Sequence, residues 1–261
     1  TVTGVDDSLV DDNVTYNIVF GTSTSTESHY NGLKIDDIEM TNIDNDFDYS
    51  LKFNGTDNWI DFEKSGPTGS SPISYSFWAK TGEDNSMNIL SQACPTDCGT
   101  DIHLKFSTGQ IGVEGLSFKN SNHFATAPFE LSNNEWHHFV FVFGDNNNFS
   151  YSNIKFYADG NEITATGHNW GGWTYDAQSY PLTVGKLAPM GNYFKGELDD
   201  IAIWQKSLTA EDVVNVMNNG VNSVTDQLVH YWNFNSGNGI IVEDQIGTNN
   251  GTITGASWVA R

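Results

Sequence analysis

Apolar and polar residues alternate along most of the chain in short runs, with the two-residue period of strands that bury one face. In ISYSFWAK (73–80), the apolar residues at every second position from Ile73 to Ala79 fall on one face. In WHHFVFVF (136–143), phenylalanines alternate with valines, so both faces of that strand should be covered, as in the middle of a stacked sheet. The pattern therefore predicts many short strands.

Turn residues separate these runs, and one helix stands among them. Asn54-Gly55 predicts a turn, and Asp159-Gly160-Asn161 predicts a hairpin turn. A helix is predicted after Thr209, which is a good N-cap, because Asp212 occupies the capping-box position and Gly220 ends the run. Many strands with one short helix predict an all-β sandwich of the jelly-roll type.

The composition shifts near residue 47 and predicts a small N-terminal β segment before the sandwich. Residues 1–46 hold many acids and one lysine, Lys34, and their strand-like runs are VTYNIVF (14–20) and IEMTNI (38–43). Acids clustered at strand ends repel one another, and a hard cation such as Ca²⁺ would neutralise them. A solvated acidic surface is the alternative, and the sequence leaves both open.

Two parts of the chain resemble known families. The stretches TVTGVDDSLVDDNVTYNIVF and YNGLKIDDIEMTNIDND, within 1–46, resemble the C-terminal half of a Calx-beta-like repeat of large bacterial surface proteins. From 47 to 261, segments such as ISYSFWAKTGEDN, EWHHFVFVF, FKGELDDIAIWQKSLTAEDV and LVHYWNF follow one another as in a LamG-like domain. That resemblance implies the concanavalin A-like lectin/glucanase fold, shared with pentraxins. It also implies a secreted or cell-surface protein with flanking domains in a longer chain.

The net charge limits the partners. The 261 residues include 11 Lys and Arg against 33 Asp and Glu, which gives a net charge of -22. Phosphates would be repelled, so the charge argues against nucleic-acid binding and against anionic membranes. No apolar run approaches the length of a membrane span. A glycan ligand should be neutral, or anionic and held through calcium.

The acidic stretch FKGELDDIAIW (194–204) bears on whether the chain is an enzyme. Glu197-Leu198-Asp199 matches the start of the E-x-D-x-x-E motif of retaining laminarinases, which share the fold that the resemblance implies. A retaining glycosidase needs two carboxyl groups about 5–5.5 Å apart, but Ala202 stands where the last Glu should be. The motif is broken, so we predict no catalytic residues. We expect Asp199 and Asp200 to be structural.

Two histidines beside Trp136 are the other candidates for a catalytic base. His137 and His138 lie inside the strand predicted over 136–143. LamG domains keep a W-x-H-type signature at this place, so we expect packed structural histidines. The nearby pair Cys94 and Cys98, in ACPTDCG, can close a small disulfide ring in a secreted chain.

The resemblance also implies bound Ca²⁺. Pentraxins have an Asp-Asn pair, part of their calcium site, at the place of Asp84 and Asn85. A single structural ion of the lectin/glucanase type would instead take backbone oxygens and one or two carboxylates from among Asp57, Asp200 and Asp244. Calcium accepts six to eight oxygen ligands. Solvated turn carboxylates are the alternative.

Large aromatic residues gather in TGHNWGGWTYDAQSYP (166–181), a glycine-rich loop before a predicted strand. Sugars present C–H faces that stack on such rings, while amide, imidazole and carboxylate groups take the hydroxyls. The alternative is a loop that folds over its own aromatics and plugs one edge of the sandwich. The candidate ligand-binding residues are Trp170, Trp173, Tyr175, His168, Asn169 and, from GNYFKG, Tyr193.

These features predict a non-catalytic, lectin-like carbohydrate-binding module that calcium stabilises. A cell-surface adhesion or protein-interaction domain without a glycan ligand is the alternative from another class. A glycosidase or lyase with an unrecognised site is the third.

Overall fold

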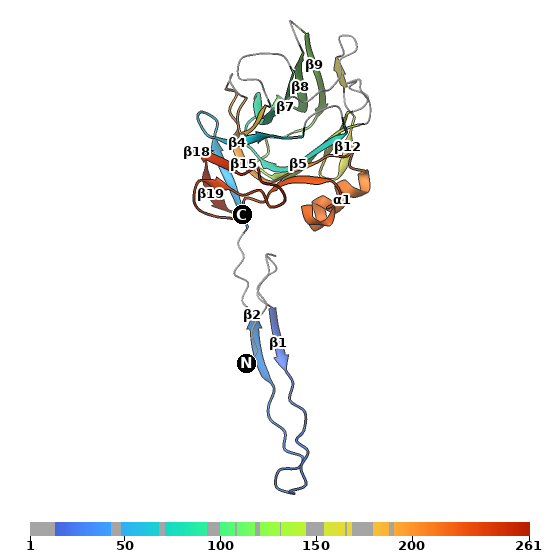
Figure 1. Cartoon of the computed structure of the whole chain (residues 1–261), viewed down its shortest axis with the longest axis vertical. Helices are drawn as coiled ribbons and strands as arrows, with labels where there is room; N and C mark the ends of the chain where they lie inside the picture. The colour runs from blue at the N-terminus through green and yellow to red at the C-terminus, as the bar shows by residue number, and fades with distance from the viewer. Residues whose placement is uncertain are drawn as a thin grey trace. The chain divides into compact units, whose positions relative to one another are not determined.

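The computed structural model in Figure 1 divides the chain into two compact units, Thr1–Asp48 and Tyr49–Arg261. The sequence places the boundary two residues earlier, at 46. The residues that the structure describes are 14–42, 48–67, 71–92, 100–107, 109–117, 121–130, 132–144, 154–164, 166–168, 180–187 and 191–261.

The first unit contains a two-stranded antiparallel sheet. Its strands β1 (Val14–Ile18) and β2 (Ile38–Asn42) pair with Tyr16 opposite Met40. Both strands lie within the runs that alternation predicts. The likeness to half of a Calx-beta repeat stays a prediction.

The second unit is built from two antiparallel sheets. The first has eight strands. In spatial order they are β12 (Asn161–Ile163), β11 (Ile154–Ala158), β10 (Trp136–Phe143), β5 (Ile73–Lys80), β15 (Lys195–Trp204), β3 (Tyr49–Asn54) and β19 (Ser257–Ala260), while β16 (Leu228–Trp232) also pairs with β15. The strand β15 pairs along one side with β5, and along the other with β3 and then β16.

The second sheet has nine strands. In spatial order they are β13 (Thr166–His168), β9 (Ser121–Pro128), β8 (Gln110–Ser117), β7 (Thr100–Ser107), β6 (Met87–Gln92), β14 (Pro181–Val184), β4 (Trp59–Ser65), β18 (Gly251–Thr254) and β17 (Ile241–Val242). Both sheets contain strands from the beginning and the end of the second unit, and short connections cross between them from β3 to β4 and from β18 to β19.

One hydrophobic cluster joins the two sheets. Phe77 of β5 stacks on Phe141 of β10, with ring centroids 5.7 Å apart, and meets Phe106 of β7, from the other sheet, at 6.3 Å. All three rings are buried. The predicted inward face of 73–80 is therefore confirmed, and the sheets pack as a sandwich.

A second cluster covers part of the outer face of the eight-stranded sheet. The helix α1 (Ala210–Asn219) and the short 3₁₀-helix η2 (Val221–Ser223) pack there, beside the valines of β10. Thr209 and Asp212 form the predicted capping box, and Gly220 follows the last helical residue. Among the described residues, no helix is long and apolar enough to cross a membrane.

The turn at Asp159-Gly160 is also confirmed. Both residues have positive φ (48° and 76°), and Ala158 pairs with Asn161 across the turn. Positive φ at both central positions is typical of the type I′ hairpin that matches the twist of two strands.

Candidate functional site

The acids at the start of β15 are held by the fold. Asp199 is fully buried, and its Oδ2 accepts a hydrogen bond from Arg261 Nη1 at 2.6 Å. Glu197 lies 3.4 Å from Lys80 Nζ. The guanidinium of Arg261 also lies over the rings of Trp136 and Trp78, 4.3 and 4.9 Å from their centroids. The pair of Asp199 and Arg261 therefore anchors the end of the chain to the middle of the sheet.

The neighbouring Asp200 marks an irregularity in the same strand. Its φ is 49°, and the register of β15 against β5 shifts between Asp199 and Ala202. The hydroxyl of Tyr231 donates to Asp200 Oδ1 at 2.6 Å. Both adjacent aspartates are thus engaged with groups of the protein itself, and their structural role stays a prediction.

The two histidines of β10 are packed. His138 is buried, with Nε2 2.8 Å from Ser76 Oγ, and burial lowers its pKa to about 4, against the attraction of Asp159 and with the help of Arg261. Nδ1 of His137 lies 2.7 Å from Asp159 Oδ2. These contacts fix the two imidazoles within the sandwich.

Asp244 is the most strongly held of the predicted calcium ligands. His230 Nδ1 lies 2.7 Å from its Oδ2, and the backbone N–H groups of Gly247 and Asn249 donate to its two oxygens at 3.0 and 3.1 Å. Burial by itself would raise the pKa of Asp244. The hydrogen bonds from His230, Gly247, Asn249 and Tyr231 outweigh burial and lower this pKa to about 2. The Asp244 carboxylate thus accepts the hydrogen bonds that close the turn from Asp244 to Asn249.

The other predicted calcium ligands are distributed over separate turns. Asp57 is exposed and accepts from the side-chain amide of Asn54 at 2.8 Å. Asp84 and Asn85 are exposed in the connection between β5 and β6. Within the described ranges, no three His, Cys, Asp or Glu side chains are grouped so that they could hold a metal ion. The predicted single ion, held by backbone oxygens and one or two of the carboxylates of Asp57, Asp200 and Asp244, stays a prediction.

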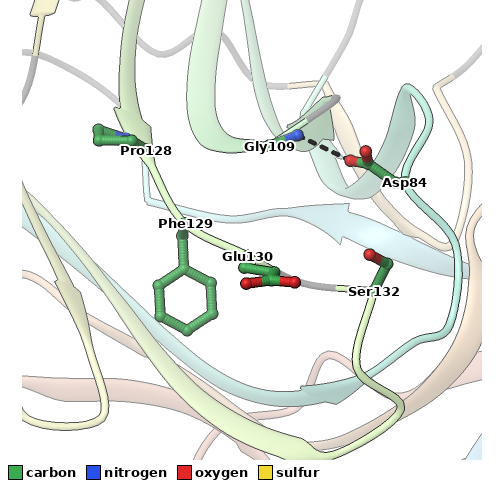
Figure 2. Close-up of a pocket in the computed structure, with 6 residues that line it drawn as sticks. All are labelled: Asp84, Gly109, Pro128, Phe129, Glu130 and Ser132. Carbon is green, nitrogen blue, oxygen red and sulfur yellow. Dashed lines mark hydrogen bonds between the residues drawn. The ribbon is translucent and has the colours of Figure 1, made fainter.

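Asp84 instead lines a pocket of about 380 Å³, shown in Figure 2. The walls come from three connections: β5 to β6, β7 to β8, and β9 to β10. Asp84 Oδ1 accepts the backbone N–H of Gly109 at 2.7 Å, and the carbonyl oxygen of Gly109 accepts the N–H of Phe129 at 3.0 Å. These bonds tie the walls together. The lining residues are Asp84, Gly109, Pro128, Phe129, Glu130 and Ser132.

The pocket combines an aromatic ring with oxygen atoms. The ring of Phe129 packs edge-on against His137 and Phe139, with centroids 5.0 and 5.3 Å apart, so the core fixes its orientation. Glu130 and Ser132 are exposed, and among the described residues none that lines the pocket is Lys or Arg. Such a site can accept hydrogen bonds from hydroxyl groups and is unfavourable for anions.

Most of the predicted glycan-binding residues lie outside the described part of the chain. This holds for Asn169, Trp170, Trp173 and Tyr175, and for the predicted disulfide between Cys94 and Cys98. Only the backbone of His168 is described. It lies in β13 and pairs with Phe124 of β9.

Tyr193 is the one member of that group whose side chain is described. Its ring lies 6.2 Å, centroid to centroid, from the ring of Trp59 in β4. Sequence reasoning missed Trp59. The signal was present, because Trp59 and Asp61 occupy the outward positions of WIDF, opposite to the buried Ile60 and Phe62.

Comparison with known proteins identifies the fold. A candidate carbohydrate-binding protein from Bacteroides ovatus is 15% identical, with a TM-score of 0.60 over 95% of this chain and 69% of that chain. A heptameric SAP-like pentraxin from Limulus polyphemus is 19% identical, with a TM-score of 0.49 over 82% of this chain and 92% of that chain.

A third solved structure is the CBM40 domain of the Ruminococcus gnavus IT-sialidase bound to α2,3-sialyllactose, at 12% identity and a TM-score of 0.48 over 65% of this chain and 96% of that chain. No curated protein matches the chain. Residues 54–214 match the family described as the concanavalin A-like lectin/glucanases superfamily. With its two-sheet sandwich and its single described α-helix, the chain belongs to this superfamily.

Proposed function

We propose that the chain is a non-catalytic carbohydrate-binding module and that the pocket of Figure 2 receives a sugar residue. The observation that supports this most is the lining of the pocket, to which Phe129 contributes together with the oxygen-bearing residues Asp84, Glu130 and Ser132. A sugar offers an apolar C–H face to such a ring and hydroxyl donors to such oxygens. The volume of about 380 Å³ is in the range of small-molecule sites.

The charge of the pocket selects among sugars. Of the lining residues that the structure describes, two are acids and none is Lys or Arg, so a carboxylated or sulfated sugar would meet repulsion at close range. The net charge of -22 adds to that repulsion. The proposed ligand is therefore a neutral glycan, or an anionic glycan held through calcium.

Similarity to other proteins supports the same proposal. The Bacteroides ovatus protein with the shared fold is named as a candidate carbohydrate-binding protein. We extend the proposal to the aromatic loop, in which Trp170, Trp173 and Tyr175 would stack on a sugar. We place the module in a secreted or cell-surface protein, in line with the LamG resemblance.

Glycan arrays followed by calorimetry test the proposal. Glu130→Ala removes an exposed acceptor of the pocket and should weaken binding of a neutral glycan about tenfold, as for the loss of one interface anchor. Glu243→Ala, another exposed acid, is the matched control and should bind as the wild type does. The array should show no preference for sulfated chains.

Two outcomes would contradict the proposal. Binding to no glycan, together with capture of a cell-surface protein, would favour the adhesion domain. Release of reducing sugar from a polysaccharide, lost in Glu197→Gln, would identify an enzyme.

Calcium is the second part of the proposal. Asp84, Glu130 and Ser132 offer oxygen atoms, the donor type that Ca²⁺ prefers. Chelation with EGTA should lower the melting temperature, and added Ca²⁺ should restore it. At a hundredfold excess over Kd, ligand linkage predicts about 2.7 kcal/mol of stabilisation. An identical melting curve after complete chelation would exclude a stabilising ion.

A further inference from the structure

Trp59 and Tyr193 form an aromatic pair that has no place in the core. Both side chains are partly exposed, and neither belongs to the two hydrophobic clusters or packs against them. Their ring planes are inclined by 43° at a centroid distance of 6.2 Å. A partly exposed pair of large rings outside the core has no evident packing role.

Two charged groups fix the indole of Trp59. Its Nε1–H donates to Asp61 Oδ2 at 2.5 Å, and Lys186 Nζ lies 3.8 Å from its ring centroid. Lys186 Nζ also lies 3.3 Å from Asp61 Oδ1, so the two charges balance locally. A cation near one face and a carboxylate at the edge leave the ring little rotational freedom.

Backbone hydrogen bonds fix the segment that carries Tyr193. Leu187 and Gly191 exchange two bonds of 2.7 and 2.8 Å, and the N–H of Phe194 donates to Gly185 at 2.9 Å. Tyr193 lies between these anchors. A ligand therefore meets a fixed indole and a fixed backbone segment beside it, which lowers the entropic cost of binding.

This aromatic pair is linked to the pocket of Figure 2 through one short segment. The backbone N–H of Asn88 donates to the carbonyl of Asn192, next to Tyr193, at 3.0 Å. Asp84, in the pocket wall, lies four residues before Asn88. A fully extended path from Asp84 to Tyr193 is thus at most about 25 Å long. An oligosaccharide of several units can span this separation.

We propose that Trp59 and Tyr193 form a second binding position for the same glycan chain, with Asp61 as a hydroxyl acceptor. The inference rests on the proposed function and makes it more specific: the ligand is an extended neutral oligosaccharide, of which one unit enters the pocket and another stacks on the aromatic pair. Asp61 is 53% exposed and can accept from a sugar while it holds Trp59.

Calorimetry with neutral oligosaccharides of increasing length tests this inference. The probes are series of glucose, mannose and xylose units, from one unit to six, and the measurements use whichever series the wild type binds. Affinity should rise with length. Trp59→Ala and Tyr193→Ala should each remove about a tenfold gain at the longest chain and leave single-sugar binding unchanged.

Three controls accompany the two variants. Trp59→Phe keeps a flat ring and should retain most of the gain. Tyr30→Ala removes an exposed aromatic ring of the first unit and should change nothing. The melting temperature of Trp59→Ala should stay within a few degrees of the wild type, because Trp59 lies outside both clusters.

The outcomes separate the two proposals. If Glu130→Ala weakens binding at every length while Trp59→Ala and Tyr193→Ala change none, the pocket stands and the second position is wrong. The second position is also wrong if affinity does not depend on length. If the wild type binds no member of these series and no glycan on the array, both proposals fall together.

Discussion

His138 and Asp244 are buried titratable side chains whose pKa values the fold moves in the same direction for different reasons. Burial lowers the pKa of His138 to about 4, so that it stays neutral in the folded protein. Hydrogen bonds lower the pKa of Asp244 to about 2 against the effect of its burial, so that it stays charged. Each should give stability a distinct dependence on pH.

His138 should make the protein less stable in mild acid. Below pH 6.5, the pKa of His138 in the unfolded state, the unfolded protein binds a proton at His138 and the folded protein does not. The free energy of unfolding therefore falls until the pH reaches about 4. The loss should be roughly 3 kcal/mol. Urea unfolding at pH 7 and pH 4 measures it. His138→Gln should lower stability at pH 7 but flatten this slope, whereas His29→Gln, exposed in the first unit, should keep it.

Asp244 should affect the free energy of unfolding at lower pH than His138 does. Its contribution is fully present above the ordinary pKa of 3.8 and is lost as the pH falls through about 2. It amounts to roughly 2 kcal/mol. Asp244→Asn should lower the free energy of unfolding by about that amount at pH 7 and weaken the dependence between pH 4 and pH 2. A variant as stable as the wild type at pH 7 would show that the turn does not need this charge.

The sequence supports a prediction of a residue's role where a short motif carries the signal. The sequence predicts structural roles for Asp199 and Asp200, because Ala202 stands where the glucanase motif needs its last Glu. The pairing of Trp59 with Tyr193 could not be predicted, because the loop before β15 brings together residues that are far apart in the chain. The alternation of WIDF places Trp59 on the outward face of its strand, but it does not show which loop contacts Trp59.

The helix α1 shows how far an element can be predicted. The signals that start and end this helix lie at its own termini. Both ends could therefore be predicted from Thr209, Asp212 and Gly220. Strands 73–80 and 136–143 were equally clear from alternation. The register shift of β15 against β5 was not, because it depends on pairing with a strand that lies far away in the sequence.

The capping box should be worth a measurable part of the stability. Thr209 Oγ1 accepts the N–H of Asp212, and the Asp212 carboxylate accepts the N–H of Thr209, at 3.1 and 3.0 Å. Thr209→Ala should cost about 1 kcal/mol in the free energy of unfolding. Glu211→Ala, an exposed neighbour in the first turn, is the control and should cost less. Equal losses in the two variants would argue against a specific cap.

At the scale of the whole molecule, the second unit contains the hydrophobic core. Every member of both clusters lies at Leu51 or beyond. The fold class followed from strand count and the resemblance, whereas the order of strands in each sheet did not, because pairing between distant strands leaves no local signal.

A chain that starts at Tyr49 should therefore fold alone. Its melting temperature should lie within a few degrees of that of the full chain, since no cluster member is removed. Differential scanning calorimetry measures this. A large fall in the melting temperature, or a loss of cooperativity, would show that the first unit supports the sandwich.

The pairing of β3 with β19 has a consequence for how the sandwich is made. Lys52 lies opposite Ser257, and Tyr49 opposite Ala260, so the earliest strand of the second unit is completed by its latest. On a ribosome, β3 must wait for the whole unit to be synthesised before that edge closes. Contacts so distant in sequence slow folding, and an unpaired strand edge attracts other chains. Nascent chains of this protein should depend on chaperones until the final strand emerges.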